Sequence, residues 1–272
     1  MKHRLTTWSS ALAPRHRAHL AAAYTTLRWR RPVSVTYEAP LYRRQYPGTV
    51  LYSPGPTGQP PEIEAAQTID IFCWEHLPQP ADLVLDIGAG TGSEALTFSR
   101  LVGPGGVVLS VEAHPVVFEA LTRTLRANGV ANVICAPVAV SDSRGQVRME
   151  DDSQGWLGNS IVKQTDSSEV TVQALRLDDL LDEQHLSDRR IALLKMNIEG
   201  AELLALQGAD ATLERTDHLA ISCHDFKGQA LGQPQLRTYR EVMGMLQDRG
   251  FTVTARRDPR PYVADVVYAT RP

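Results

Sequence analysis

The sequence contains 272 residues, of which 43% are hydrophobic and 22% are charged, and its formal net charge is -3. This length suits one large domain, or one domain with an appendage. A net negative charge excludes a protein whose overall charge attracts polyanions. The sequence also contains no RNP-like, zinc or basic-helix motif, so we expect no nucleic-acid partner. The three cysteines are widely spaced among apolar residues, which predicts buried thiols rather than disulfides or a metal site.

The distribution of apolar residues also bears on the compartment. No apolar run approaches the length of a membrane span, and the N-terminus lacks the apolar core of a signal peptide. We therefore expect a soluble protein in a reducing, cytoplasmic compartment, without a membrane partner. The sequence leaves a homo-oligomer open.

Residues 1–60 are predicted to form an N-terminal extension. Residues 1–37 carry lysine and arginine but no acidic residue, and apolar residues between them suit one or two amphipathic helices. Such an arm packs on the domain, binds an anionic substrate or carrier, or acts as a transit peptide; its aromatic residues favour packing. Residues 40–61 are rich in proline and glycine, which predicts a linker or an ordered loop.

Residues 61–272 show alternating strand and helix patterns, which predict a parallel sheet covered on both faces. After a helix over 62–77, strands are expected at 84–87, 106–112, 132–140, 191–196 and 219–223. Helices are expected at 93–101, 115–128, 177–181, from 197 to about 214, and at 236–248. Residues 146–177 interrupt the alternation with short strands at 147–149, 160–162 and 170–172, and 251–254 with 264–268 predict a closing hairpin.

Residues 84–92 read Val-Leu-Asp-Ile-Gly-Ala-Gly-Thr-Gly, a buried strand that enters a glycine turn before a helix. Glycine permits positive φ angles and lets a ligand lie on the backbone, and the helix offers unpaired N–H groups. The turn also fits a dinucleotide pattern. However, Asp86 and Glu94 would repel a diphosphate, whereas they suit the ammonium and sulfonium charges of S-adenosylmethionine.

The second predicted strand ends in Glu112, where nucleotide-binding α/β folds hold two ribose hydroxyls with one carboxylate. We therefore predict that Glu112 binds the ribose of the cofactor. Asp86 is a candidate for cofactor contact, and a role in capping the turn is equally open for it.

The motifs, in their order, resemble the FkbM family of S-adenosylmethionine-dependent methyltransferases. The resemblance covers about residues 62–224. It implies a class I methyltransferase fold, a Rossmann-like α/β sheet of seven strands with the last one antiparallel, which agrees with the predicted hairpin. The motifs are Asp86–Gly92, Val111–Pro115, Ala139–Asp142, Leu177–Leu181 and Lys195–Glu202.

The family pattern usually has Asp where this chain has Asn197, which puts a role that needs charge there in doubt, although an amide still forms hydrogen bonds. The family's activity implies O-methylation, with a small-molecule hydroxyl, on a natural product or a sugar, as the acceptor. On these motifs we predict a cofactor site made of Asp86, Gly88, Ala89, Gly90, Gly92, Glu112, Ala113, Val140 and Asn197.

Catalytic residues are expected at the carboxyl ends of the strands, where open parallel sheets bind ligands. We predict His224 as the base that removes the hydroxyl proton, together with Glu199 and Asp225. The alternative to a metal-free site is Mg²⁺ held by these three residues, which would lower the pKa of the hydroxyl. The structural alternatives are that Glu199 favours a helix N-terminus and that His224 and Asp225 form a hydrogen-bonded loop pair; we rank the functional role of His224 above its alternative and the metal below it.

Trp156 and Asn159 lie in the polar segment of the insertion over 146–177, which we expect over the cofactor end of the sheet. They are candidates for substrate contact, and a surface hairpin is the equal alternative. Two other functions also stay open. One is a cofactor-binding protein without catalysis, and the other is an NAD(P)-dependent oxidoreductase that uses the same glycine turn.

Overall fold

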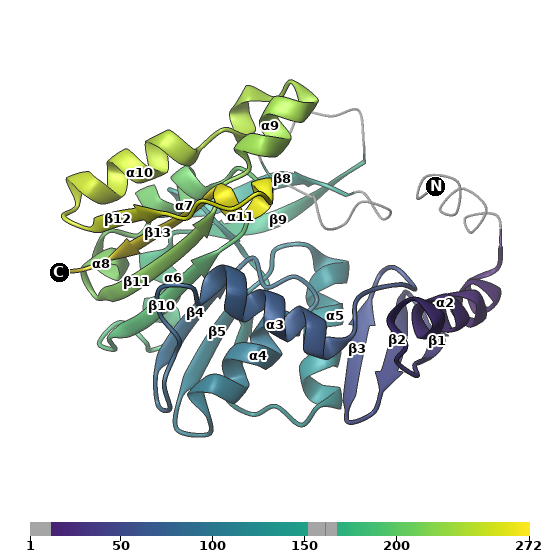
Figure 1. Ribbon diagram of the computed structural model, residues 1–272. Coiled ribbons are helices and arrows are strands. Elements are labelled where there is room, and N and C mark those ends of the chain that lie inside the picture. Colours follow the sequence, from purple (N-terminus) through teal and green to yellow (C-terminus); the bar gives the residue numbers. More distant parts are fainter. Residues whose placement is uncertain (1–11, 152–160, 162–167) are drawn as a thin grey trace.

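The central element of the fold is a seven-stranded sheet, seen in a computed structural model that describes residues 12–151, 161 and 168–272 (Figure 1). Its strands are β4 (Leu83–Ile87), β5 (Val107–Val111), β6 (Val133–Ala136), β10 (Ile191–Met196), β11 (Thr216–Ser222), β12 (Thr252–Ala255) and β13 (Val266–Thr270). Their order in space is β12-β13-β11-β10-β4-β5-β6, and β13 runs antiparallel to both of its neighbours. This topology confirms the predicted class I methyltransferase sheet with an antiparallel last strand.

Both faces of the sheet are covered, because alternate residues of its central strands pack on opposite layers of helices. Leu85 belongs to the core shared with α6, α7, α8 and α10, whereas Val84 packs with α3 and α4. The helices are α3 (Pro61–Phe72), α4 (Ser93–Val102), α5 (Pro115–Ala127), α6 (Leu177–Glu183), α7 (Glu202–Gln207), α8 (Asp210–Glu214), α9 (Asp225–Leu231), η2 (Pro234–Leu236), α10 (Tyr239–Asp248) and α11 (Pro261–Ala264).

Several predicted helix bounds need correction. Helix α3 ends at Phe72 rather than at residue 77, and the helix expected from 197 to about 214 is divided into α7 and α8. The division falls at Gly208, where a Cβ would lie 2.2 Å from the carbonyl oxygen of Ser141. Helix α9 was not predicted. Among the helices of the described ranges, none combines the length and the apolar character needed to cross a bilayer.

The N-terminal extension contains a second sheet. Strands β1 (Ser34–Glu38), β2 (Leu41–Tyr46) and β3 (Thr49–Ser53) form an antiparallel meander, and helix α2 (Pro14–Trp29) packs on it. The prediction of a linker or ordered loop over 40–61 is therefore wrong for β2 and β3. The prolines that suggested a loop lie at strand boundaries, since Pro40 precedes β2, Pro47 lies in the turn and Pro54 follows β3.

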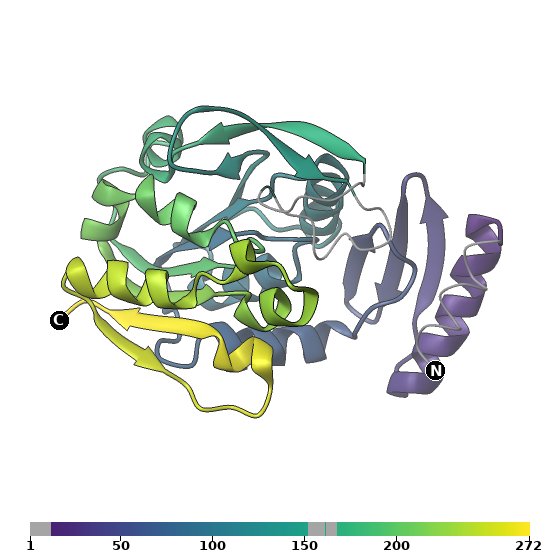
Figure 2. The ribbon, with the colours of Figure 1, turned by 90° about the horizontal axis from the view of Figure 1, so that it is seen from above.

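Strand β3 attaches this second sheet to the large domain through helix α5. The backbone N–H of Tyr52 donates to the hydroxyl of Thr124 (3.0 Å), and the Asn128 side chain bonds both the N–H and the carbonyl of Val50 (3.1 and 2.7 Å). The chain then reaches α3 at Pro61, next to the predicted boundary at residues 60 and 61. Figure 2 shows α2 at the outer edge, with the three strands between it and the large domain.

A third, small sheet covers one end of the central sheet. It consists of β7 (Ala139–Val140), β9 (Glu169–Leu175) and β8 (Gly145–Glu150), in that order. The single strand predicted over 132–140 is thus two strands in different sheets, because Pro137 and Val138 separate β6 from β7. The strands expected at 147–149 and 170–172 lie within β8 and β9. The one expected at 160–162 falls outside the described residues, apart from Ile161.

Candidate active site

The glycine turn after β4 lies against the adjoining strands β5 and β10. The backbone N–H groups of Gly88 and Ala89 both donate to the carbonyl of Val111 at 2.9 Å, which holds the turn beside the end of β5. Gly88 has a φ of +78°, and a Cβ there would lie 2.1 Å from the carbonyl oxygen of Asn197. Glycine is therefore required at this position by conformation and by space.

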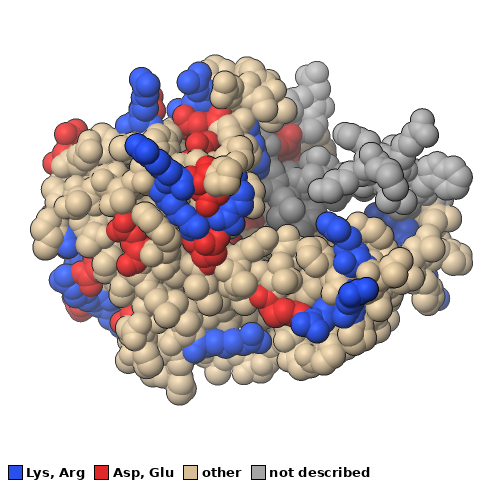
Figure 3. Space-filling view, viewed as in Figure 1, with Lys and Arg blue, Asp and Glu red and all other residues tan. Residues whose placement is uncertain are grey.

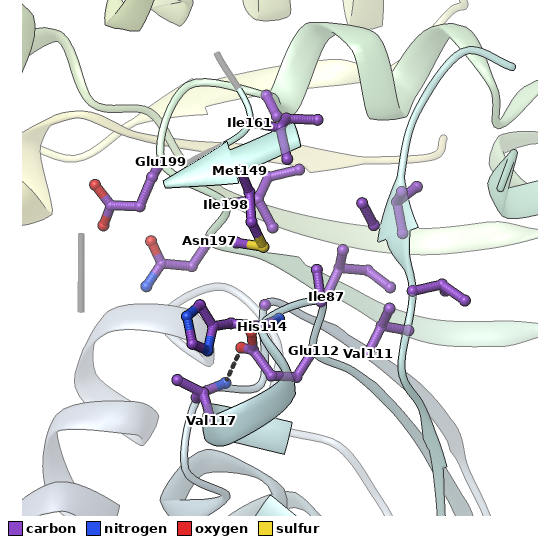
Figure 4. A pocket seen from close by; sticks show the side chains of 17 residues that line it. Ile87, Val111, Glu112, His114, Val117, Met149, Ile161, Asn197, Ile198 and Glu199 are labelled. Atoms are coloured by element: carbon purple, nitrogen blue, oxygen red, sulfur yellow. Dashed lines mark hydrogen bonds between the residues drawn. The ribbon is translucent and has the colours of Figure 1, made fainter. Parts of the chain in front are cut away.

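A cavity of about 770 Å³, counting its open mouth, lies at the carboxyl ends of β4, β5 and β10 (Figure 4). Figure 4 shows Met149 and Ile161 across the cavity from Glu112 and His114, with Asn197 and Glu199 at one side. The lining residues are Ile87, Gly88, Gly90, Val111, Glu112, Ala113, His114, Val117, Val138, Ala139, Val140, Met149, Ile161, Asn197, Ile198, Glu199 and Ala201.

The predicted cofactor residues divide between this cavity and the structure behind it. Gly88, Gly90, Glu112, Ala113, Val140 and Asn197 line the cavity, whereas Asp86, Ala89 and Gly92 do not. Gly92 instead packs on α5, where a Cβ would lie 2.9 Å from Leu121. The insertion contributes Met149 and Ile161, as expected for a segment over the cofactor end of the sheet. Trp156 and Asn159 lie outside the described residues.

Glu112 projects into the cavity and is held by backbone groups. One oxygen accepts the N–H of Gly90 (3.0 Å) and the other accepts the N–H of His114 (2.8 Å). Burial raises the pKa of Glu112 to about 7, even though these two hydrogen bonds favour the charged form. The carboxylate is thus oriented for a ligand while it remains close to its titration point at neutral pH.

Asp86 has a different environment from the one we predicted. Its carboxylate is fully buried behind the turn and bonds the ammonium of Lys195 at 2.9 Å; Lys195 also pairs with Glu94 and donates to the carbonyl of Gly88 at 2.8 Å. Lys195 is itself fully buried. The direct cofactor contact expected of Asp86 is therefore replaced by the alternative role of fixing the turn. Because Lys195 offsets one of the two negative charges, the two carboxylates argue less strongly against a diphosphate than their positions in the sequence suggest.

Asn197 and Glu199 follow β10 and line one side of the cavity, beside Met149 of the small sheet. The side-chain oxygen of Asn197 is buried and finds no hydrogen-bond partner among the described residues. Glu199 has a left-handed backbone conformation, with a φ of +56°, and its carboxylate bonds Lys227 at 2.6 Å and His224 at 3.2 Å. Burial favours a higher pKa for Glu199, but the bonds from His224 and Lys227 outweigh it and lower the pKa.

His224 lies between two carboxylates, away from the cavity lining. Its Nδ1 bonds Glu202 at 3.0 Å and its Nε2 bonds Glu199 at 3.2 Å. Burial alone would lower the pKa of His224, but the two carboxylates raise it to about 9. The residue is consequently an imidazolium at neutral pH, with both ring nitrogens engaged. This environment corrects the expectation that His224 is the catalytic base, because no free lone pair remains to accept a proton.

The structure places Asp225 outside the cavity, which also bears on the predicted Mg²⁺ site. The Asp225 carboxylate accepts the backbone N–H of Tyr239 at 3.0 Å, where α10 begins, and does not line the cavity. Glu199, His224 and Asp225 therefore do not converge on one point. Within the described ranges, no group of three or more His, Cys, Asp or Glu side chains has an arrangement that would hold a metal ion.

His114 is a cavity residue that we did not predict. Its ring is almost fully buried; Nε2 bonds Asp151 at 3.1 Å, and Nδ1 has no hydrogen-bond partner among the described residues. The sequence places it two residues after Glu112, in the same strand-to-helix turn. That spacing was a usable signal, since a residue two positions beyond a ribose-binding carboxylate stays near the same ligand.

A family model for the FkbM methyltransferase domain matches residues 86–253, more than half of the chain. The chain belongs to the FkbM methyltransferase family. This membership identifies a methyltransferase that uses S-adenosylmethionine, and it favours that cofactor over the nicotinamide alternative.

Other similar proteins align with different parts of this FkbM methyltransferase. It is 24% identical over 207 residues to Methyltransferase 1 of Beauveria bassiana, across 68% of this chain and 78% of that protein. It is 32% identical over 82 residues to a protein-L-isoaspartate O-methyltransferase of Thermosipho melanesiensis, across 30% of this chain and 41% of that protein. Fibrillarin of Aeropyrum pernix, solved with S-adenosylmethionine, aligns over 88% of this chain and 99% of that chain, with 16% identity and a TM-score of 0.47.

The alignment with the isoaspartate methyltransferases is short. The chain spans 41% of the Thermosipho enzyme and 45% of one from Methanococcus maripaludis. The cavity nevertheless fits S-adenosylmethionine on its own features: an oriented carboxylate at Glu112, apolar surface at Val140 and Met149, and an unpartnered amide oxygen at Asn197. These groups match hydroxyls, a purine ring and an ammonium group, respectively.

Proposed function

We propose that this FkbM methyltransferase methylates a hydroxyl group of a small molecule. The observation that carries the proposal is Glu199, a carboxylate that lines the cavity and is held ionised by two cations. An ionised carboxylate accepts a hydrogen bond from a hydroxyl and so orients its oxygen toward a methyl donor.

The cofactor, when bound, supplies a methyl group on a positively charged sulfur. In our proposal Glu112 accepts hydrogen bonds from the ribose hydroxyls, Ala113 and Val140 contact the purine, and the Asn197 amide oxygen accepts a hydrogen bond from the ammonium group. Gly90 leaves room for the ligand along the turn, since a Cβ there would meet no protein atom within 4 Å. These roles place the methionine end of the cofactor beside Glu199.

Glu199 then receives the proton of the acceptor hydroxyl. Its lowered pKa makes it a weak base, which is sufficient because a hydroxyl oxygen becomes strongly acidic once it gains a methyl group. His224 acts as a positioning residue, because its Nε2 fixes one oxygen of Glu199 and its charge keeps the carboxylate ionised. The hydroxyl thus loses its proton late, as the new bond forms.

A carboxylate acceptor, such as that of the isoaspartate methyltransferases, suits this arrangement less well. His224 and Lys227, the cations beside Glu199, are already paired with it. An incoming carboxylate would meet Glu199 as a like charge, whereas a hydroxyl would donate a hydrogen bond to it. The geometry therefore favours a neutral alcohol or phenol.

The test is methyl transfer from labelled S-adenosylmethionine to a panel of sugars and phenolic compounds, with products assigned by mass spectrometry. We expect O-methyl products from the native chain. Glu199→Gln should lower kcat by at least about 100-fold, the usual range for a lost proton acceptor. Its affinity for S-adenosylmethionine, measured by calorimetry, should stay within about threefold, because its role concerns the acceptor.

Glu241→Gln is the matched control, since Glu241 is an exposed residue on α10. It should leave both kcat and cofactor affinity unchanged. Methyl transfer to nitrogen or carboxylate acceptors instead of hydroxyls would overturn the proposed acceptor class. Tight cofactor binding without turnover on any acceptor would indicate a binding protein, and native kcat in Glu199→Gln would remove Glu199 from the mechanism.

A further inference from the structure

His114 lies at the start of helix α5 and forms part of the cavity wall. The residue is 4% exposed, and its Nε2 bonds Asp151 at 3.1 Å. Its Nδ1 is buried, does not cap α5 and has no hydrogen-bond partner among the described residues. The mechanism proposed above gives this nitrogen no task. One polar atom of a cavity residue is therefore left for a ligand.

The missing partner of Nδ1 is informative because the atom is buried. Figure 3 shows basic and acidic side chains interspersed over the face of the large domain that it presents, where a group without a protein partner bonds water. Nδ1 of His114 is enclosed instead. Buried polar groups in folded proteins are almost always hydrogen-bonded, so an exception in a cavity wall points to a ligand group that completes the pair.

The bond at Nε2 determines what Nδ1 can bind. A carboxylate only accepts hydrogen bonds, so Asp151 requires a proton on Nε2. In the neutral ring Nδ1 then accepts a hydrogen bond, and in the charged ring it donates one. A hydroxyl group suits both forms, because it donates through its proton and accepts through its oxygen. An amino group of the purine suits the neutral ring alone, so Nδ1 matches a hydroxyl best.

Asp151 is itself held in place directly after strand β8. Its backbone N–H donates to the carbonyl of Ser168 at 2.7 Å, and the Ser168 hydroxyl donates to the carbonyl of Asp151 at 2.8 Å. These two residues continue the ladder in which β8 and β9 end with Glu150 opposite Glu169. The His114 ring is consequently fixed from two sides, by α5 and by the small sheet.

The hydroxyls nearest to this ring are those that we assign to Glu112. The N–H of His114 donates to one oxygen of Glu112 at 2.8 Å, so the ring and the carboxylate belong to one turn. Figure 4 shows both side chains across the cavity from Met149 and Ile161. A ribose that bonds Glu112 therefore lies beside the His114 ring.

We propose that His114 is a second ribose-binding residue, whose Nδ1 forms a hydrogen bond with one ribose hydroxyl of S-adenosylmethionine. The proposal rests on the ribose-binding role proposed for Glu112 and is independent of the acceptor class. Asp151 is a positioning residue, because its bond to Nε2 directs Nδ1 toward the ligand. The distinction between a ribose and a deoxyribose thus depends on two side chains of the same turn, Glu112 and His114.

Calorimetry with S-adenosylhomocysteine and with its 2′-deoxy and 3′-deoxy forms tests this contact. The measurements are made at pH 8, where Glu112 is ionised. Removing the bound hydroxyl should weaken binding to the native chain at least about tenfold. In His114→Ala the loss caused by the same removal should be at least about threefold smaller, because one partner of the hydroxyl is already gone.

Two conservative variants separate direct binding from support. In His114→Asn, a polar atom of the amide takes the position of Nδ1 but does not reach Asp151. In His114→Gln, the longer amide replaces Nε2 and leaves the position of Nδ1 empty. We expect His114→Asn to retain most of the native dependence on the hydroxyl and His114→Gln to lose it. The opposite order would show that His114 acts only through Asp151, and the proposal would be wrong.

The controls are His16→Asn and His16→Gln, at an exposed position on α2, which should bind all three ligands as the native chain does. Glu112→Ala should also reduce the effect of removing a hydroxyl. A reduced effect in Glu112→Ala with a native effect in His114→Ala would overturn this proposal and leave the role of Glu112 intact. Native effects in both variants would overturn the two ribose assignments together.

Discussion

Two buried clusters near the active site share a composition but differ in their relation to the cavity. In one, Lys195 lies between Asp86 and Glu94 under the glycine turn. In the other, His224 lies between Glu199 and Glu202. Lys195 and Asp86 are fully buried and do not line the cavity, whereas Glu199 does. A cation between two carboxylates thus supports the backbone in the first cluster, and in our proposal it holds a reactive carboxylate in the second.

The difference shows why charge pattern alone does not identify a catalytic group. The Lys195 cluster joins strand β10 to the turn after β4, and Lys195 and Asp86 are fully buried behind that turn. The His224 cluster is closed at Glu202, which also accepts the Gly200 N–H and the Thr238 hydroxyl, and open at Glu199. In our proposal, contact with the cavity distinguishes the cluster that takes part in the reaction from the cluster that supports the backbone.

The largest expected effect comes from removing the cation of the first cluster. Lys195→Met would leave Asp86 fully buried, and neither Asp86 nor the partly buried Glu94 would have its cation. We expect the free energy of unfolding to fall by about 3–5 kcal/mol, because an uncompensated buried charge is strongly destabilising. Urea unfolding followed by circular dichroism measures this change.

A double variant distinguishes the effect of charge from the effect of packing. In Lys195→Met with Glu94→Gln, one of the two uncompensated charges is absent, so part of the stability should return. If the double variant is no more stable than Lys195→Met alone, then the loss comes from packing and not from charge.

The next effect concerns the pH dependence set by His224. Its pKa of about 9 in the folded protein lies above the ordinary value of 6.5. The protonated His224 therefore stabilises the folded protein. This stabilisation is fully present below pH 6.5 and is lost as the pH rises toward 9. It amounts to about 3 kcal/mol at most. Urea unfolding of the native chain at several pH values should show this decline.

His224→Gln should remove the decline between pH 6.5 and 9, because the substituted side chain does not titrate. His16→Gln, at an exposed position on α2, should retain it. A decline that persists in His224→Gln would show that another group causes it, and His224 would then not be the imidazolium that holds Glu199.

The sequence was sufficient for the large sheet because its signals are local. Apolar strands, the glycine turn and the closing hairpin each occupy a few consecutive residues. The N-terminal sheet was missed because prolines and glycines at the ends of β2 and β3 resemble those of a loop. Strand alternation over Leu41–Tyr46 was the weaker signal, since arginines interrupt it.

The side-chain clusters could not be predicted in the same way, because their members are far apart in the sequence. Lys195 and Asp86 are 109 residues apart, and His224 is 22 residues from Glu202. Each residue alone fits a strand end or a helix start, and pairing depends on the order of strands in the sheet. The sequence located Glu199 and His224 at the correct end of the sheet but not which one faces the cavity.

Glu112 is a third carboxylate of the region and differs from Asp86 and Glu199. It lines the cavity but is held by backbone N–H groups instead of a paired cation. Its pKa of about 7 means that it gains a proton in mildly acidic solution. The charged form accepts hydrogen bonds from both ribose hydroxyls, and the protonated form does so less well. We therefore expect the affinity for S-adenosylmethionine to fall about tenfold from pH 8 to pH 6.

Calorimetry across this range, with the native chain and Glu112→Ala, separates the carboxylate from other groups. At pH 8, Glu112→Ala should bind at least about tenfold more weakly, and its affinity should no longer depend on pH between 6 and 8. Glu241→Gln should keep the native dependence. A native chain whose affinity is equal at both pH values would show that Glu112 does not contact the cofactor. The ribose would then depend on other donors and acceptors of the cavity, of which His114 is the nearest in sequence.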